Sequence, residues 1–167
     1  MADKLSQPRE ALHKEILKSI LTVAGALRSA DYPSTDMEKN KITIEHLLRS
    51  TSKNIIWKLI ATGEGLAKWI ADSVVLNGDR LTLTWGDSMR HHEERTATVV
   101  AIEKFGRIRW HWDDDDEATY VEIRMDRNAL TGEYTLHITD FTDDDDKEWL
   151  YDIWNQNFER LYRSSGV

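Results

Sequence analysis

The sequence contains no cysteine among its 167 residues. This absence excludes disulfides, thiolate metal sites and cysteine nucleophiles, and it suits a reducing compartment such as the cytoplasm. No run of 18 apolar residues occurs either, so we expect no membrane span. The apolar stretch ILKSILTVAGAL is interrupted by Lys18 and Ser19, which is not the pattern of a secretory leader. We therefore expect a cytoplasmic protein.

Basic residues are too few for a nucleic-acid-binding protein. Lysine and arginine number 22 against 30 acidic residues, which gives a formal charge of −8 and a pI of about 5.2. Proteins that bind nucleic acid need a basic face, because phosphate contacts supply most of their affinity. The hydrophobic content of 40% and the charged content of 31% are typical of a globular protein. This length favours one domain, or one domain with an appendage.

Sequence motifs of catalysis are also lacking. We can place no glycine-rich phosphate loop, no Ser/His/Asp arrangement and no paired-carboxylate motif, and the glycines of GDRLTLTWGD have the wrong spacing for a nucleotide loop. We therefore expect no cofactor and no catalytic residue. An enzyme would need a polar residue that faces inward, and His46 is the one candidate, on the face of Ile42 and Ile44.

An aspartate run at residues 113–116 attracts attention as a possible calcium site. An EF-hand loop needs glycine at its sixth position and glutamate at its twelfth. Counted from Asp113, these positions hold Ala118 and Arg124. We therefore interpret the run as a solvated hairpin turn that discourages edge pairing. A second run, TDDDDKE at residues 142–148, precedes a helix, whose positive end its charges favour.

Two adjacent histidines, His91 and His92, are followed by Glu93 and Glu94. Zinc ligands must converge on one point, whereas adjacent residues of a strand point to opposite faces. We interpret these residues as a polar loop, and we expect no metal site anywhere in the chain.

The first 36 residues differ from the rest of the chain. Apolar residues recur at helical spacing from Leu12 to Leu27, after a helix start at Ser6, and a polar stretch with a proline follows. We predict an N-terminal helical appendage and linker at residues 1–36 and one domain at residues 37–167. The helix would cover part of the main domain or of a second copy.

Beyond Lys41 the pattern changes to short strands and few helices. KITIEHLLRS alternates as a strand, a helix follows with Ser52 as its cap, and GLAKWIAD predicts a second short helix. The turn NGD predicts a hairpin, further strands follow at tight turns, and KEWLYDIWNQNFERLYRSS predicts a long terminal helix. Strands joined by short turns are antiparallel. We predict an α+β fold in which a curved antiparallel sheet of about six to seven strands wraps around the C-terminal helix.

Four segments carry a family resemblance: ITIEHLLRSTSKNIIWKLI, GLAKWIAD, DRLTLTWG with the strand RTATVVAIEKF, and EWLYDIWNQNFERLY. In this order they resemble the START-like superfamily (helix-grip, SRPBCC), nearest to the group related to Aha-type co-chaperone domains. The resemblance implies a cavity between the sheet and the terminal helix. Members of this superfamily bind lipids, sterols and other apolar molecules there, while some are enzymes and some are co-chaperones.

Seven tryptophans supply the side chains that such a cavity needs. Alternation along the strands and helical spacing along the terminal helix direct one set of apolar residues to a shared interior. The same residues could fill a core or line a partly empty cavity. The predicted ligand-binding residues are Trp85, Trp110, Trp112, Ile123, Leu136, Trp154 and Phe158.

Three functions remain open from the sequence. The leading hypothesis is non-catalytic binding of a small hydrophobic ligand, such as a lipid. The alternative is a protein-interaction or co-chaperone-like module with a filled core, in which the acidic surface or the N-terminal helix meets a protein partner. The third is an enzyme that acts in the cavity through His46. The sequence does not determine the oligomeric state.

Overall fold

The computed structural model describes residues 39–87 and 91–167. The helix and linker predicted within residues 1–36 lie outside these ranges. In the described part, no helix is long and apolar enough to cross a membrane.

A seven-stranded antiparallel sheet carries the helices of the domain, which confirms the predicted α+β architecture. The strands lie in the order β1-β7-β6-β5-β4-β3-β2, so that β1 pairs with β7, the first and last strands of the described residues. The elements are β1 (Asn40–Leu47), α2 (Lys53–Ala61), α3 (Gly63–Leu66), β2 (Ser73–Asn77), β3 (Arg80–Gly86), β4 (His92–Glu103), β5 (Arg107–Trp112), β6 (Val121–Arg127), β7 (Tyr134–Thr142), the 3-10 turn η1 (Asp144–Asp146) and α4 (Lys147–Ser165).

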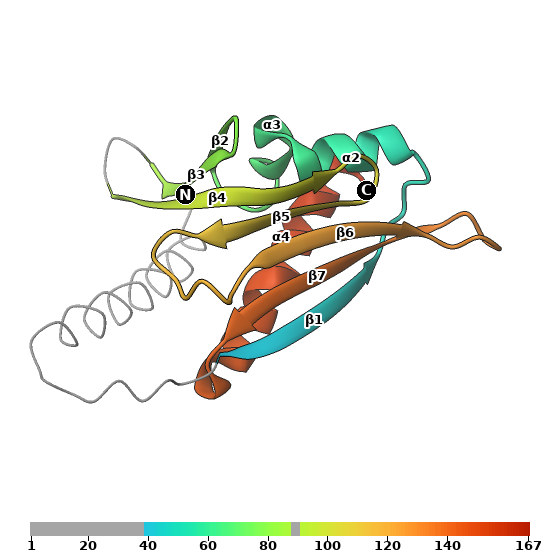
Figure 1. Ribbon diagram of the computed structural model, residues 1–167. Coiled ribbons are helices and arrows are strands. Elements are labelled where there is room, and N and C mark those ends of the chain that lie inside the picture. The colour runs from blue at the N-terminus through green and yellow to red at the C-terminus, as the bar shows by residue number, and fades with distance from the viewer. Residues whose placement is uncertain (1–38, 88–90) are drawn as a thin grey trace, which may run out of the picture. The chain divides into compact units, whose positions relative to one another are not determined.

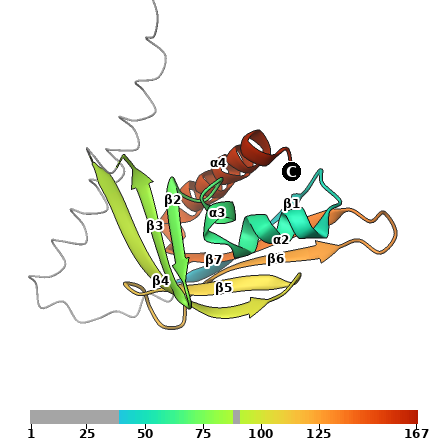
Figure 2. The ribbon, with the colours of Figure 1, turned by 90° about the horizontal axis from the view of Figure 1, so that it is seen from above.

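The sheet is strongly curved, and α2, α3 and α4 all lie on its concave side (Figures 1 and 2). The 19-residue helix α4 is the longest of the three, and it buries one face against the sheet. Its buried residues at helical spacing are Leu150, Trp154, Asn157, Phe158 and Leu161. This is the helix-grip arrangement, in which the curved sheet and the long helix cover each other's apolar faces.

The strand register aligns isoleucines of neighbouring strands, and these side chains form the floor of the concave face. Ile108 of β5 lies opposite Ile123 of β6, Ile123 lies opposite Ile138 of β7, and Ile138 lies opposite Ile44 of β1. This row of isoleucines is buried except at its β1 end. Burying one such side chain is worth roughly 1.5–3 kcal/mol. The alternation read from the sequence is confirmed on these strands.

The hairpin predicted around Asn77-Gly78-Asp79 joins β2 and β3, and Gly78 adopts a positive φ of 63°. The neighbouring strand, β4, begins earlier than the sequence pattern indicated. His92 and Glu93, read as a polar loop, pair with Gly86 and Trp85 of β3. Ladder hydrogen bonds hold these polar residues in the strand although their side chains are exposed.

The second short helix begins and ends earlier than predicted. The segment GLAKWIAD suggested a helix from Gly65, but α3 spans Gly63–Leu66 and is capped by Thr62, whose hydroxyl accepts a hydrogen bond from Gly65 N at 3.0 Å. A Cβ on Gly65 would lie 2.0 Å from the carbonyl oxygen of Lys58 in α2. Glycine is therefore needed at position 65 for the close packing of α3 on α2. Ser52 occupies the N-cap position of α2 but makes no capping hydrogen bond through its side chain.

Candidate functional site

The centre of the concave face is filled by four aromatic side chains, which we call the aromatic cluster: His46, Trp69, Trp154 and Phe158. The rings of His46 and Phe158 stack with centroids 4.1 Å apart and planes 3° apart. Trp69 is fully buried, contacts both Trp154 and Phe158, and donates a hydrogen bond from Nε1 to Leu59 O at 3.1 Å.

Four of the predicted ligand-binding residues contribute to this packed centre. Trp154 and Phe158 belong to the aromatic cluster, and Ile123 and Leu136 are buried on the sheet floor. Trp69 was missed from the predicted set, although its segment GLAKWIAD was read as a helix that ends near a tryptophan. Only the tertiary structure shows that this indole points between the sheet and α4.

His46 was the one candidate for catalysis, and its surroundings are apolar. Burial lowers the pKa of His46, which keeps its imidazole neutral at physiological pH. Its ring stacks on Phe158, and within residues 39–87 and 91–167 no carboxylate hydrogen-bonds to it. An acid–base role needs such an orienting partner, so the geometry gives no support to catalysis by His46.

The three remaining predicted residues come from β3 and β5, the strands on either side of β4, and lie toward one end of the same face. Trp85 and Trp112 are partly buried, whereas only 1% of the Trp110 surface is exposed. The rings of Trp110 and Trp112 meet edge to face at 6.1 Å. Trp85 Nε1 donates to Ile70 O at 2.9 Å. We call Trp85, Trp110 and Trp112 the tryptophan end of the concave face.

Trp110 differs from the other buried indoles in one respect. Its Nε1–H is buried and has no hydrogen-bond partner among residues 39–87 and 91–167. Trp69, Trp85 and Trp154 each donate from the same atom to a nearby oxygen. Buried donors in folded proteins are nearly always paired, and an exception needs an explanation such as a water or a ligand.

The Trp110 side chain lies in a row that runs across four strands. Trp110 of β5 is opposite Val121 of β6, and Asp140 of β7 is opposite Ile42 of β1. Since Glu122 pairs with Thr139, Val121 lies beside Asp140. Two strand spacings separate the backbones of Trp110 and Asp140, which amounts to about 10 Å. We call this set the Trp110–Asp140 row; it carries two polar groups on an otherwise apolar face.

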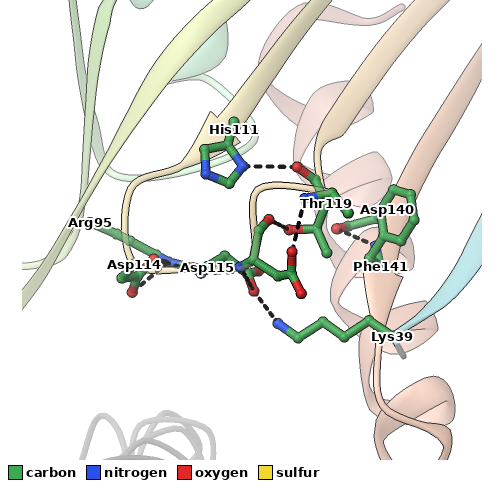
Figure 3. Close-up of polar contacts among 10 residues, drawn as sticks. Lys39, Arg95, His111, Asp114, Asp115, Thr119, Asp140 and Phe141 are labelled. Carbon is green, nitrogen blue, oxygen red and sulfur yellow. Dashed lines mark hydrogen bonds and ion pairs between the residues drawn. The ribbon is translucent and has the colours of Figure 1, made fainter. Parts of the chain in front are cut away.

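Asp140 is the most perturbed carboxyl group at this end. Burial raises its pKa to about 6, although hydrogen bonds from Phe141 N and from Trp154 Nε1 oppose that rise. Its Oδ1 accepts from Phe141 N at 2.8 Å (Figure 3). Its Oδ2 accepts from Trp154 Nε1 at 2.9 Å. Asp140 therefore connects β7 to α4 and places a negative charge near the tryptophan end above about pH 6.

The aspartate run forms the turn between β5 and β6, as predicted, with Asp113, Asp114 and Asp116 exposed, but Asp115 is partly buried. Arg95 of β4 and Lys39 reach the turn from two sides (Figure 3). Asp114 binds Arg95 at 2.9 Å, and Asp115 pairs with Lys39 and lies 3.8 Å from Arg95. The Asp115 side chain is only 11% exposed, because it lies between these two cations. We call Lys39, Arg95, Asp114 and Asp115 the clasp.

The clasp borders the tryptophan end. The Arg95 guanidinium lies 4.1 Å from the ring centroid of Trp112, a cation–π contact. Burial by itself would raise the pKa of Asp115, but the hydrogen bonds from Lys39 and from the Asp116 backbone, together with the charges of Lys39 and Arg95, lower it. Asp115 is therefore ionised at neutral pH, and its charge is already matched by the two basic groups.

The two acidic runs and the histidine pair were the positions where a metal site was considered. In the part of the chain that is described, no group of three or more histidine, aspartate or glutamate side chains could hold an ion. His91 and His92 are exposed. In the second run, Asp144 binds Lys147 at the start of α4, and Asp146 occupies the N-cap position without a capping bond from its side chain.

A separate groove of about 280 Å³ lies between α2, α3 and the end of α4. Apolar side chains, among them the half-exposed Ile55, lie beside charged and hydroxyl groups. The lining includes Ile55, Lys58, Leu59, Lys68, Ser164 and Ser165. No sequence pattern marked this groove, because its residues come from three separate helices.

Known structures share both the fold and, in one case, much of the sequence. A Bacteroides fragilis protein solved by solution NMR, BfR322, is 44% identical over 76% of this chain and 91% of its own, with a TM-score of 0.54. The Aha1 dimer from Colwellia psychrerythraea is 13% identical over 76% of this chain and 98% of its own (TM-score 0.56). DynU16, from the dynemicin biosynthetic locus, is 16% identical over 75% and 48% (TM-score 0.58).

The two weaker likenesses show the shared fold alone. A search of curated proteins gave no significant match. The profile of the START-like superfamily domain matches residues 36–167, nearly the whole chain after the predicted appendage. The resemblance read from the sequence is thereby confirmed, and the chain belongs to the START-like superfamily.

Proposed function

We propose that this START-like protein binds a small, mostly apolar molecule without catalysing a reaction. The binding site is the tryptophan end of the concave face, between sheet and α4, rather than its centre. The observation that carries this proposal is the buried Nε1–H of Trp110, which lacks a partner in the described part of the chain. A bound molecule with an oxygen beside this atom would supply the missing hydrogen bond.

The surroundings of Trp110 suit a ligand of this kind. Trp85 and Trp112 offer large aromatic surfaces that the protein itself covers only in part. Covering one such surface with a ligand contributes roughly 1.5–3 kcal/mol, so that contact with several of them supports a dissociation constant on the order of micromolar. Binding sites for small molecules are mostly apolar and contain a few polar groups that fix the orientation. The Trp110–Asp140 row has this composition.

The seven residues predicted from the sequence take different roles in this proposal. Trp85, Trp110 and Trp112 contact the ligand. The others support the site from the packed centre and the floor: Ile123, Leu136, Trp154 and Phe158. We place the function in the cytoplasm, since a sequence without cysteine suits a reducing compartment.

Native mass spectrometry of the protein purified from its own cells tests the proposal. We expect a bound small molecule, and we expect compounds from a panel of apolar molecules to raise the melting temperature. Trp112→Leu should reduce both effects. Trp149→Leu is the matched control, because Trp149 lies on α4 and is 37% exposed. Absence of a bound molecule, together with a melting temperature that no compound moves, would contradict the proposal.

A second candidate function is a protein-interaction module. The aromatic cluster fills the centre of the concave face, and the helical groove presents Ile55 with 52% of its surface exposed. In this groove Ile55 lies beside Lys58, Glu64 and Lys68, so a partner could cover an apolar contact inside a charged rim. Cross-linking in cells should then capture a partner through the groove, and Ile55→Asp should abolish this capture while Trp112→Leu leaves it unchanged. Under the ligand proposal, Trp112→Leu should weaken the binding of small molecules, and Ile55→Asp should leave it unchanged.

A further inference from the structure

The Trp110–Asp140 row contains information about the chemistry of the ligand. The indole Nε1–H of Trp110 can only donate a hydrogen bond. It is buried on the concave face, where Trp110 is 1% exposed, and no described residue accepts a hydrogen bond from it. The group that pairs with this N–H must therefore be a hydrogen-bond acceptor.

The charges around the row decide which kind of acceptor fits. Arg95, the cation nearest Trp112, is already bound by Asp114 at 2.9 Å and lies 3.8 Å from Asp115. Asp140 adds a carboxyl group about two strand spacings from Trp110, or about 10 Å. Beside the row, the described residues 39–87 and 91–167 offer a ligand carboxylate these carboxyl groups and the already bound Arg95, and burying an unpaired charge is costly.

We propose that the ligand bears a neutral acceptor, such as a ketone or amide oxygen, which Trp110 Nε1 binds, and that this end of the face discriminates against carboxylates. This inference rests on the proposed function and specifies the polar group of its ligand. It also makes Trp110 a specificity-determining residue, because loss of its N–H removes the preference for the acceptor without removing the apolar contacts.

Three compounds of nearly equal shape test the inference: 2-acetylnaphthalene, its hydrocarbon isostere 2-isopropenylnaphthalene, and 2-naphthoate. We expect the ketone to bind about 10-fold tighter than the hydrocarbon, which corresponds to one good hydrogen bond. The carboxylate should bind at least about 10-fold more weakly than the ketone. Calorimetry measures the ketone and the carboxylate, and competition against the ketone measures the hydrocarbon.

Trp110→Phe should make the ketone and the hydrocarbon equal in affinity. Trp69→Phe is the matched control: it removes an indole N–H outside the tryptophan end that already donates to Leu59 O at 3.1 Å, so the ratio between ketone and hydrocarbon should stay as in the wild type. Circular dichroism and thermal melting establish that both variants fold.

The outcomes separate this inference from the proposed function. Two results with the wild type overturn the inference and leave the proposed function standing. One is equal affinity for the ketone and the hydrocarbon, which is expected if a buried water already accepts from Trp110 Nε1. The other is a carboxylate that binds more tightly than both. If all three compounds fail, the molecule in the native mass spectrum decides. A neutral acceptor-bearing molecule that Trp110→Phe loses supports the inference, any other molecule overturns it, and no molecule overturns the proposed function as well.

Discussion

Phe158 of α4 stacks on His46 of β1 with ring centroids 4.1 Å apart, so that the terminal helix and an edge strand are joined by one nearly parallel ring pair. Replacing Phe158 with leucine removes this stack and part of the buried area. We expect a loss of about 1–2 kcal/mol in the free energy of unfolding, measured by urea denaturation.

The same substitution should change the titration of His46. Burial lowers the pKa of His46, and a smaller residue at position 158 gives water better access to the imidazole. Its pKa should therefore rise toward the ordinary value in Phe158→Leu, as followed by NMR. An unchanged pKa would mean that Phe158 does not control the exposure of His46.

The clasp predicts unequal roles for neighbouring aspartates. The Asp115 side chain is 11% exposed between Lys39 and Arg95, whereas that of Asp114 is 65% exposed. Asp115→Asn leaves these cations partly unmatched and should cost about 2 kcal/mol of unfolding free energy. Asp114→Asn should cost less than about 0.5 kcal/mol, which makes it the matched control.

The effect of Asp115→Asn should also depend on pH. Because the pKa of Asp115 is lowered in the folded protein, its stabilising contribution is present above the pKa of the unfolded chain and is lost as the pH falls. The difference between wild type and variant should therefore fade toward acid pH. Equal costs for the two asparagine variants at neutral pH would contradict the buried clasp.

Close packing of α2 and α3 depends on Gly65. An added Cβ would lie 2.0 Å from the carbonyl oxygen of Lys58, and backbone must move to relieve this overlap. Gly65→Ala should destabilise the domain by about 3 kcal/mol or more, measured by thermal or urea unfolding. Gly106→Ala should cost less than about 1 kcal/mol, since the nearest atom to its Cβ would be 3.3 Å away. Similar costs for both would show that α3 can shift freely.

Asp140 should make the protein less stable as the pH rises. Its pKa is about 6 in the folded protein against 3.8 as the reference value, so the folded state holds the proton more tightly. Stability from this group is therefore fully present below about pH 4 and is lost as the pH rises through 6. Between pH 4.5 and 7.5 the loss should be about 1–2 kcal/mol.

Asp140→Asn isolates this contribution, because it cannot ionise and keeps one oxygen as an acceptor. The difference in unfolding free energy between the variant and wild type should shift by about 1–2 kcal/mol in favour of the variant as the pH rises from 4.5 to 7.5. A constant difference across this range would show that burial does not raise the pKa of Asp140.

The sequence by itself determined the elements and the faces. Alternation in RIRWHW placed Ile108 and Trp110 on the inner side, because successive residues of a strand point to opposite faces. The turn NGD determined one hairpin, and helical spacing in EWLYDIWNQNFERLY determined the stripe of α4. These features depend on neighbours in the chain, which a local pattern contains.

Tertiary structure alone decided which inner residues are packed together and which keep an unpaired group. Trp69 enters the aromatic cluster from a segment far from α4 in the sequence, and Lys39 meets Asp115 across 76 positions of the chain. The unpartnered N–H of Trp110 is likewise a property of everything around it. Local patterns predict the direction of a side chain, but its partners depend on how the sheet curves around α4, and no single stretch of sequence specifies that curvature.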